Sequence, residues 1–334
     1  MEKLKLCTKD DILGLTNIRI GETKLGEKVQ TISDNALALT TCKFVLLGIP
    51  EDIGVKANFG IGGARTAWEP ALKSLLNIQS TEKFRGDEIL IFGALDFSEE
   101  LSQAQSLDSQ NAGDLQKLRT LVGQVDEKVE EVLSMIFAAG KIPIVVGGGH
   151  NNSYPILKAF SKSFKTAVNT INLDAHSDFR ALEGRHSGNG FSYAFKEGFL
   201  DKYSIIGLHE NYNSQAIISE LKSHPKQIQY VFFDDFIREN NSYSRAFQEA
   251  MNFTEGLCGL EIDLDSIAGA LTSAMSPSGF SADQVRDMIA QTAVQQFLYL
   301  HVAEGAGKLD DGRENPQTGK LIAYLISDFI KAQL

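Results

Sequence analysis

Residues 142–150 read Ile-Pro-Ile-Val-Val-Gly-Gly-Gly-His, an apolar run that ends in three glycines and a histidine. A short continuous apolar run of this kind is typical of a strand that is buried on both faces and opens into a tight loop. Before it, apolar residues recur at helical spacing from Asp114 to Ala139 and predict one long amphipathic helix. A helix, a buried strand and a glycine-rich loop in this order indicate an α/β protein.

The same order of elements recurs along the chain. Apolar runs predict about eight strands, at Phe44–Ile49, Ile89–Phe92, Ile142–Val146, Val168–Leu173, Tyr203–Ile206, Tyr230–Phe233, Gly259–Leu264 and Phe297–Val302. Helical patterns span Ala64–Leu76, Leu115–Ala139, Tyr154–Phe160, Ala282–Gln295 and Thr318–Leu334. This alternation predicts a mostly parallel sheet that helices cover on both faces. Because no linker or repeat divides the sequence, we expect residues 1–334 to form a single three-layer α/β/α domain, with the polar segment Glu99–Gly113 as an insertion or flexible surface loop.

The composition narrows the class of protein. The 334 residues include 32 Lys and Arg against 43 Asp and Glu, which gives a formal net charge of −11. Nucleic-acid binding needs a basic face, so this balance argues against it. The three cysteines, Cys7, Cys42 and Cys258, form no CxxC pair. The sequence also has no N-terminal apolar run and no stretch of ~20 apolar residues. Together with the scattered cysteines, this predicts a cytoplasmic protein without a membrane span.

Three polar clusters lie at the ends of predicted strands or directly after them. They are Gly147-Gly-Gly-His150, Asp174-Ala-His-Ser-Asp178 and Asp263-Leu-Asp265. In an open parallel sheet the ligand crevice lies beyond the carboxyl ends of the strands, which is where these clusters fall. If the chain stays extended, alternate side chains project to the same side, so the acidic residues and histidines of each cluster should converge.

Such a convergence indicates a metal site. Two imidazoles and four carboxylates would repel one another, or stay partly protonated, unless a cation neutralised them. The set is rich in hard oxygen ligands, which suits Mn²⁺, and it is too large for one tetrahedral zinc ion. Six ligands predict two Mn²⁺ per chain, about 3.5–4 Å apart. The competing interpretation is structural, since glycines can form a turn, Asp-x-Asp can cap a helix, and a lone histidine such as His209, His224 or His301 is more often a hydrogen-bonded core or surface residue.

With these three clusters the chain resembles the ureohydrolases, the family of arginase, agmatinase and formimidoylglutamase. The resemblance extends to Gly48-Ile-Pro-Glu-Asp52, Gly62-Gly-Ala-Arg65 and His301-Val-Ala-Glu304. It implies a fold of the arginase type and a binuclear manganese site whose ligands are His150, Asp174, His176, Asp178, Asp263 and Asp265. The sequence departs from the family pattern at Glu261, where serine is usual, and at Ala268-Gly269, where Asp-Pro is usual.

The resemblance also implies a reaction. A hydroxide held between the two ions would attack the carbon of a linear amidine or guanidine and cleave its C–N bond. Asp178 is the expected proton shuttle, Glu304 is expected to pair with the cationic group of the substrate, and His186 is a candidate proton relay.

Position 180 favours one substrate. Arg180 stands where the arginase pattern has asparagine, and a guanidinium can hold a substrate carboxylate through two hydrogen bonds. Formimidoylglutamases share this arginine, which predicts hydrolysis of N-formimidoyl-L-glutamate to L-glutamate and formamide, a step of histidine degradation. Ser187 and Asn189 are candidate substrate contacts, whereas Arg185 is either a second carboxylate contact or, as we favour, solvated.

Other functions remain open at this level. The small-molecule substrate could instead be arginine, agmatine or another guanidine, in which case the protein would be the matching hydrolase. A protein of a different class is also conceivable, namely a non-catalytic metal-binding scaffold. The sequence leaves open whether the chain forms a homo-oligomer.

Overall fold

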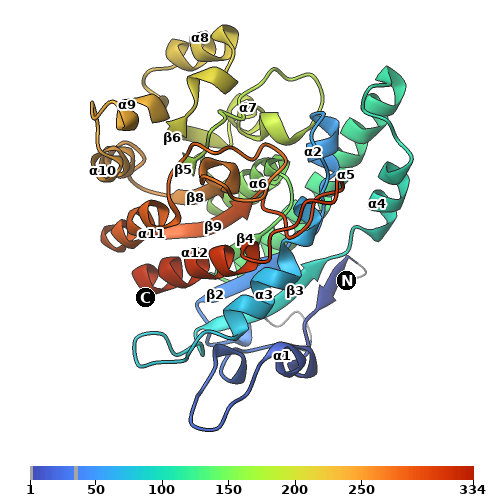
Figure 1. Cartoon of the computed structure of the whole chain (residues 1–334), viewed down its shortest axis with the longest axis vertical. Coiled ribbons are helices and arrows are strands. Elements are labelled where there is room, and N and C mark those ends of the chain that lie inside the picture. The colour runs from blue at the N-terminus through green and yellow to red at the C-terminus, as the bar shows by residue number, and fades with distance from the viewer. Residues whose placement is uncertain (1–2, 34–36) are drawn as a thin grey trace.

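The computed structural model describes residues 3–33 and 37–334 and places a nine-stranded sheet at their centre (Figure 1). The strand order is β1-β3-β2-β4-β9-β8-β5-β6-β7, and all pairs are parallel except β1 with β3. The strands are β1 (Leu4–Leu6), β2 (Phe44–Gly48), β3 (Ile89–Leu95), β4 (Ile142–Val146), β5 (Val168–Leu173), β6 (Leu200–Leu208), β7 (Ile228–Phe232), β8 (Cys258–Asp263) and β9 (Phe297–Ala303). The eight predicted strands are confirmed as β2 to β9. The sequence did not predict β1, which has three residues and lies at the edge of the sheet.

Twelve α-helices accompany this sheet in the described residues. They are α1 (Lys9–Leu15), α2 (Ile53–Ala57), α3 (Trp68–Leu76), α4 (Ser98–Gln105), α5 (Ala112–Ala138), α6 (Ser153–Phe164), α7 (Gly190–Lys196), α8 (Gln215–Ser223), α9 (Phe233–Ile237), α10 (Tyr243–Phe253), α11 (Ala282–Gln291) and α12 (Thr318–Gln333). No helix in this part of the chain is both long enough and apolar enough to cross a membrane.

Helices pack on both faces of the sheet, so the fold has the three predicted layers. On one face α3, α10, α11 and α12 share a hydrophobic cluster with Phe44 and Leu46 of β2. On the other face α5, α6, α7 and α8 share a second cluster with Val45 and Leu47 of the same strand. Alternate residues of one strand therefore enter different cores, which is why the central strands are apolar throughout.

The interpretation of Glu99–Gly113 as an insertion or surface loop is wrong for its first half, which is helix α4. Glu99 and Glu100 lie in the first turn, where acidic side chains stabilise a helix. Only Leu101 and Ala104 face the core, so the apolar stripe is too short to give a periodic pattern in the sequence.

Candidate metal centre

The three polar clusters meet at one edge of the sheet. The first two follow β4 and β5, the third begins at Asp263, the last residue of β8, and Glu304 directly follows β9. The strands β4, β9, β8 and β5 are consecutive neighbours and run parallel, so their carboxyl ends lie side by side. Residues from four separate parts of the sequence are thereby brought to the crevice at which α/β proteins bind ligands.

The first group of candidate ligands surrounds His150. Its Nδ1 atom lies 3.2 Å from Asp174 Oδ2, 2.9 Å from Asp178 Oδ2 and 3.1 Å from Asp263 Oδ2. All four residues are buried, and their potential ligand atoms lie within 4.8 Å of one another. One imidazole nitrogen and three carboxylates form a hard donor set that suits Mn²⁺.

The second group lies beside the first and shares a residue with it. His176 Nδ1 is 2.9 Å from Asp265 Oδ2 and 3.7 Å from Asp174 Oδ1. Asp174 therefore presents Oδ2 to the first group and Oδ1 to the second. A carboxylate in this position can bridge two cations.

The segment after β5 is not extended, so that part of the prediction is wrong. The backbone N–H of His176 donates to Asp174 Oδ1 at 2.7 Å, which turns the chain back on itself. Asp178 then adopts a left-handed conformation with φ of 46°, and Glu304 does the same with φ of 62°. Positive φ values are uncommon outside glycine and are concentrated at functional sites, where the surrounding structure holds them in place. The side chains converge through a tight loop rather than through strand alternation.

The charges of the cluster call for a counter-cation. Burial, with the nearby charge of Asp178, raises the pKa of Asp174 to about 7. Burial also raises the pKa of Asp263 well above its usual range. Burial lowers the pKa of His150, but its contacts with the carboxylates outweigh this and raise it overall. Although His150 is fully buried, neither ring nitrogen has a hydrogen-bond partner. The raised pKa values of the carboxyl groups and the unpaired nitrogens of His150 both fit a site that holds divalent cations among these side chains.

Glu304 borders the first group. Its Oε1 atom accepts the backbone N–H of His150 at 2.8 Å. Burial raises the pKa of its carboxyl group to about 8. Burial therefore favours the protonated, uncharged form of this carboxyl group, whereas a cationic group placed beside its second oxygen would favour the ionised form.

Arg180 and Ser187 belong to a polar group that the sequence only partly revealed. The Arg180 side chain is 43% exposed and donates from Nη1 to Asn58 Oδ1 at 3.0 Å. Asn58 in turn donates from Nδ2 to Ser187 Oγ at 3.2 Å. Sequence reasoning missed Asn58, which lies more than 100 residues from both partners. No local sequence pattern marks Asn58, and only the structure shows that the adjacent Phe59 is exposed and has φ of 65°.

The structure does not support Asn189 as a substrate contact, and it corrects the expectation that Arg185 is solvated. Asn189 Oδ1 accepts from Arg185 Nη1 at 2.7 Å, and its Nδ2 donates to Gly184 O at 2.8 Å. Arg185 is buried and binds Asp126 through two contacts, of 2.9 and 3.3 Å. The guanidinium also lies against the rings of Tyr154 and Tyr193. These residues stabilise the loop after β5 and do not line its surface.

Replacing Arg185 by methionine is expected to lower the free energy of unfolding by about 3–5 kcal/mol, because it leaves Asp126 as an unpaired buried charge. Urea unfolding followed by circular dichroism measures the change. Arg245→Met is the control, since Arg245 forms an exposed pair with Glu249 and should shift stability by no more than about 0.5 kcal/mol. Equal shifts in the two variants would contradict this assignment.

His186 lies outside both ligand groups. Its Nδ1 accepts the backbone N–H of Gly188 at 3.1 Å, and its Nε2 lies 3.1 Å from Glu183 Oε1. Burial, aided by the charges of Arg180 and Arg119, lowers the pKa of the imidazole to about 4. The ring is therefore neutral at pH 7, and both nitrogens have protein partners, so the geometry gives no support to its predicted role as a proton relay.

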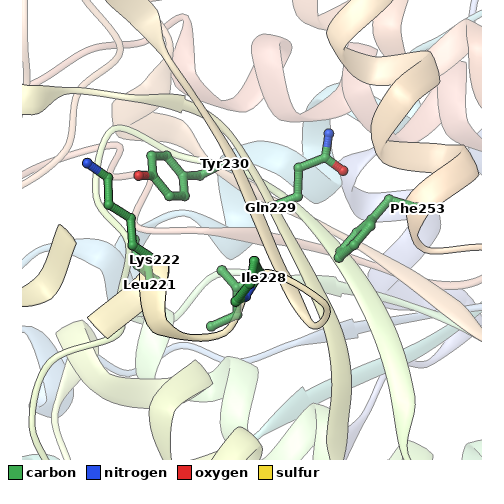
Figure 2. Close-up of a pocket in the computed structure, with 7 residues that line it drawn as sticks. Leu221, Lys222, Ile228, Gln229, Tyr230 and Phe253 are labelled. Atoms are coloured by element: carbon green, nitrogen blue, oxygen red, sulfur yellow. The ribbon is translucent and has the colours of Figure 1, made fainter. Parts of the chain in front are cut away.

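A separate hollow of about 400 Å³ lies against the edge strand β7 (Figure 2). It is lined by the first half of that strand, by the end of α8 and by Phe253 of α10. Among the described residues that line it, Lys222 supplies the charged group. One lysine among apolar and amide side chains offers no ligand set for a metal, so the candidate site remains the cluster at the carboxyl ends of the central strands.

Comparisons with known proteins bear on the fold and on the family of this chain. The sequence is 27% identical over 237 residues to a formimidoylglutamase from Staphylococcus aureus strain JH9, which covers 65% of this chain and 74% of that protein. The fold is similar to that of a formiminoglutamase from Trypanosoma cruzi solved with Mn²⁺, with a TM-score of 0.73, 18% identity and coverage of 93% of this chain and 98% of that one. For the formimidoylglutamase from Bacillus subtilis the TM-score is 0.75 at 17% identity, over 95% of this chain and 93% of that one. The sequence model of the arginase family matches residues 43–331, and the chain therefore belongs to the arginase family.

Proposed function

We propose that this protein is a Mn²⁺-dependent hydrolase that converts N-formimidoyl-L-glutamate and water to L-glutamate and formamide. The observation that carries the proposal is the pair of ligand groups joined by Asp174, with the exposed Arg180 two residues beyond Asp178. The similarity to formimidoylglutamases supports the reaction class, the cleavage of a C–N bond in a linear amidine. In this function residues 1–334 would act as one domain.

The residues present fit two metal ions. His150, Asp174, Asp178 and Asp263 would hold one Mn²⁺, and Asp174, His176 and Asp265 would hold the other. When bound, such a pair of cations supplies a hydroxide nucleophile near neutral pH and balances the four carboxylate charges.

The protein's own side chains would then position the substrate and move its protons. Glu304 is placed to accept hydrogen bonds from the amidinium through the oxygen that does not contact His150. Arg180 would bind a substrate carboxylate, with Ser187 and Asn58 beside it. Asp178 would carry a proton to the glutamate nitrogen as the bond from that nitrogen to the formimidoyl carbon breaks.

A substrate panel tests this function. Purified protein with excess Mn²⁺ is incubated with formimidoylglutamate, arginine, agmatine or guanidinobutyrate, and the release of formamide and urea is measured. We expect formamide from the first compound and no urea from the other three. Activity on arginine or agmatine alone would overturn the substrate assignment, and no activity on any compound would favour a metal-binding scaffold without turnover.

Replacing Arg180 by methionine is expected to raise KM for formimidoylglutamate by roughly 10- to 100-fold, since a hydrogen bond to a charged group contributes about 1.5–3 kcal/mol. The value of kcat should change less, because Arg180 would bind the part of the substrate that does not react. Steady-state kinetics measure both. Arg180→Lys is the matched comparison, and it should keep part of the affinity because it retains the charge but not the paired hydrogen bonds. An unchanged KM in Arg180→Met would argue against this carboxylate site.

A further inference from the structure

Glu261 is a fully buried carboxylate behind the candidate metal centre. It lies on β8, two residues before Asp263, and pairs in register with His301 on the neighbouring strand β9. Burying a carboxylate costs several kcal/mol unless it is paired and hydrogen-bonded. The partners of Glu261 therefore indicate what it does.

Two of these partners hold Glu261 in place. Its Oε1 atom accepts a hydrogen bond from the hydroxyl of Tyr299 at 2.8 Å. Its Oε2 atom lies 2.6 Å from His301 Nδ1. The other ring nitrogen of His301 lies 3.3 Å from the carbonyl oxygen of Gly147, so His301 connects Glu261 to the glycine loop that carries His150.

The third contact of Glu261 is with His150 itself. His150 Nε2 lies 3.4 Å from Glu261 Oε2, whereas Nδ1 of the same ring faces Asp174, Asp178 and Asp263. The imidazole therefore lies between the candidate ligands on one side and one carboxylate on the other. Histidines that bind metals usually donate their second N–H to a carboxylate or carbonyl, which fixes the tautomer and makes the ligating nitrogen more basic.

We propose that Glu261, held by Tyr299 and His301, is a positioning residue that orients His150 for metal binding. With a cation bound, the carboxylate would keep the proton of His150 on Nε2 across the 3.4 Å contact and leave the lone pair of Nδ1 free to bind the metal. This inference rests on the proposed metal-dependent function, because it assumes that His150 is a ligand. Loss of such a supporting carboxylate typically weakens metal binding by about 10- to 100-fold.

Calorimetric titration of the metal-free, full-length protein with Mn²⁺ tests the inference without an activity assay. We expect Glu261→Gln to bind Mn²⁺ about 10- to 100-fold more weakly at one of two sites and normally at the other. Glu100→Gln is the matched control, since Glu100 is also a buried glutamate but pairs with Lys128 on the surface helices α4 and α5. The control should keep both Mn²⁺ affinities, whatever its thermal stability.

Tyr299→Phe provides a second variant that removes only the hydroxyl and leaves the carboxylate. We expect it to weaken the same Mn²⁺ site several-fold, and it decides the question if Glu261→Gln does not fold. If Glu261→Gln folds, or Tyr299→Phe in its place, and binds Mn²⁺ with wild-type affinity at both sites, the inference is overturned and the proposed function stays intact. A lower melting temperature would not change this conclusion. A wild-type protein that bound no Mn²⁺ would overturn both.

Discussion

Replacing Asp174 by asparagine is expected to reduce hydrolysis by at least ~1,000-fold and to lower the Mn²⁺ content from the proposed two per chain to below one. Asp174 is the residue that both ligand groups share, so the substitution removes a charge from each of them. A bound metal ion contributes several kcal/mol of transition-state stabilisation, and each 1.36 kcal/mol corresponds to a factor of ten in rate. Elemental analysis of the purified variant and a formamide-release assay measure the two effects.

The control for this change is Asp126→Asn, which makes the same substitution at another buried aspartate. Asp126 pairs with Arg185 and belongs to neither ligand group. We expect it to lower stability while the folded protein keeps two Mn²⁺ per chain. If Asp174→Asn kept full metal content and activity, the bridging position assigned to Asp174 would be wrong.

The central strands could be predicted from the sequence because burial on both faces makes them apolar throughout. Val45 and Leu46, for example, enter different cores although they are adjacent. The edge strand β1 lacks this double burial and gave no signal. Likewise, the candidate ligands could be found because each lies at the end of a predicted strand or soon after it, and parallel strands align their carboxyl ends.

The remaining parts of the site depend on contacts that no local pattern encodes. Glu261 and His301 meet only because β8 and β9 pair in one particular register. Arg185 was expected to be solvated because charged side chains usually are, but its partner Asp126 lies 59 residues earlier, on α5. The roles of Glu261, His301 and Arg185 therefore depend on tertiary contacts and could not be predicted from the residues around them in the sequence.

Replacing Asp178 by asparagine is expected to lower kcat by roughly 100- to 10,000-fold, the usual contribution of a general acid or base. Asp178 contacts His150 at 2.9 Å and adopts φ of 46°, a conformation that asparagine tolerates well, so the backbone of the loop should persist. Because Asp178 is also a candidate ligand, the rate has to be measured at Mn²⁺ concentrations that saturate the variant.

Glu239→Gln is the matched control, since Glu239 also has a positive φ, of 56°, but lies exposed after α9. It should leave kcat unchanged. A loss of activity in Asp178→Asn that excess Mn²⁺ restored fully would show that Asp178 only binds metal. If kcat stayed low at full metal occupancy, Asp178 would also transfer the proton. If Asp178→Asn turned over at the wild-type rate without added Mn²⁺, Asp178 would have neither role, because the loss of a metal ligand or of a proton shuttle should slow the reaction.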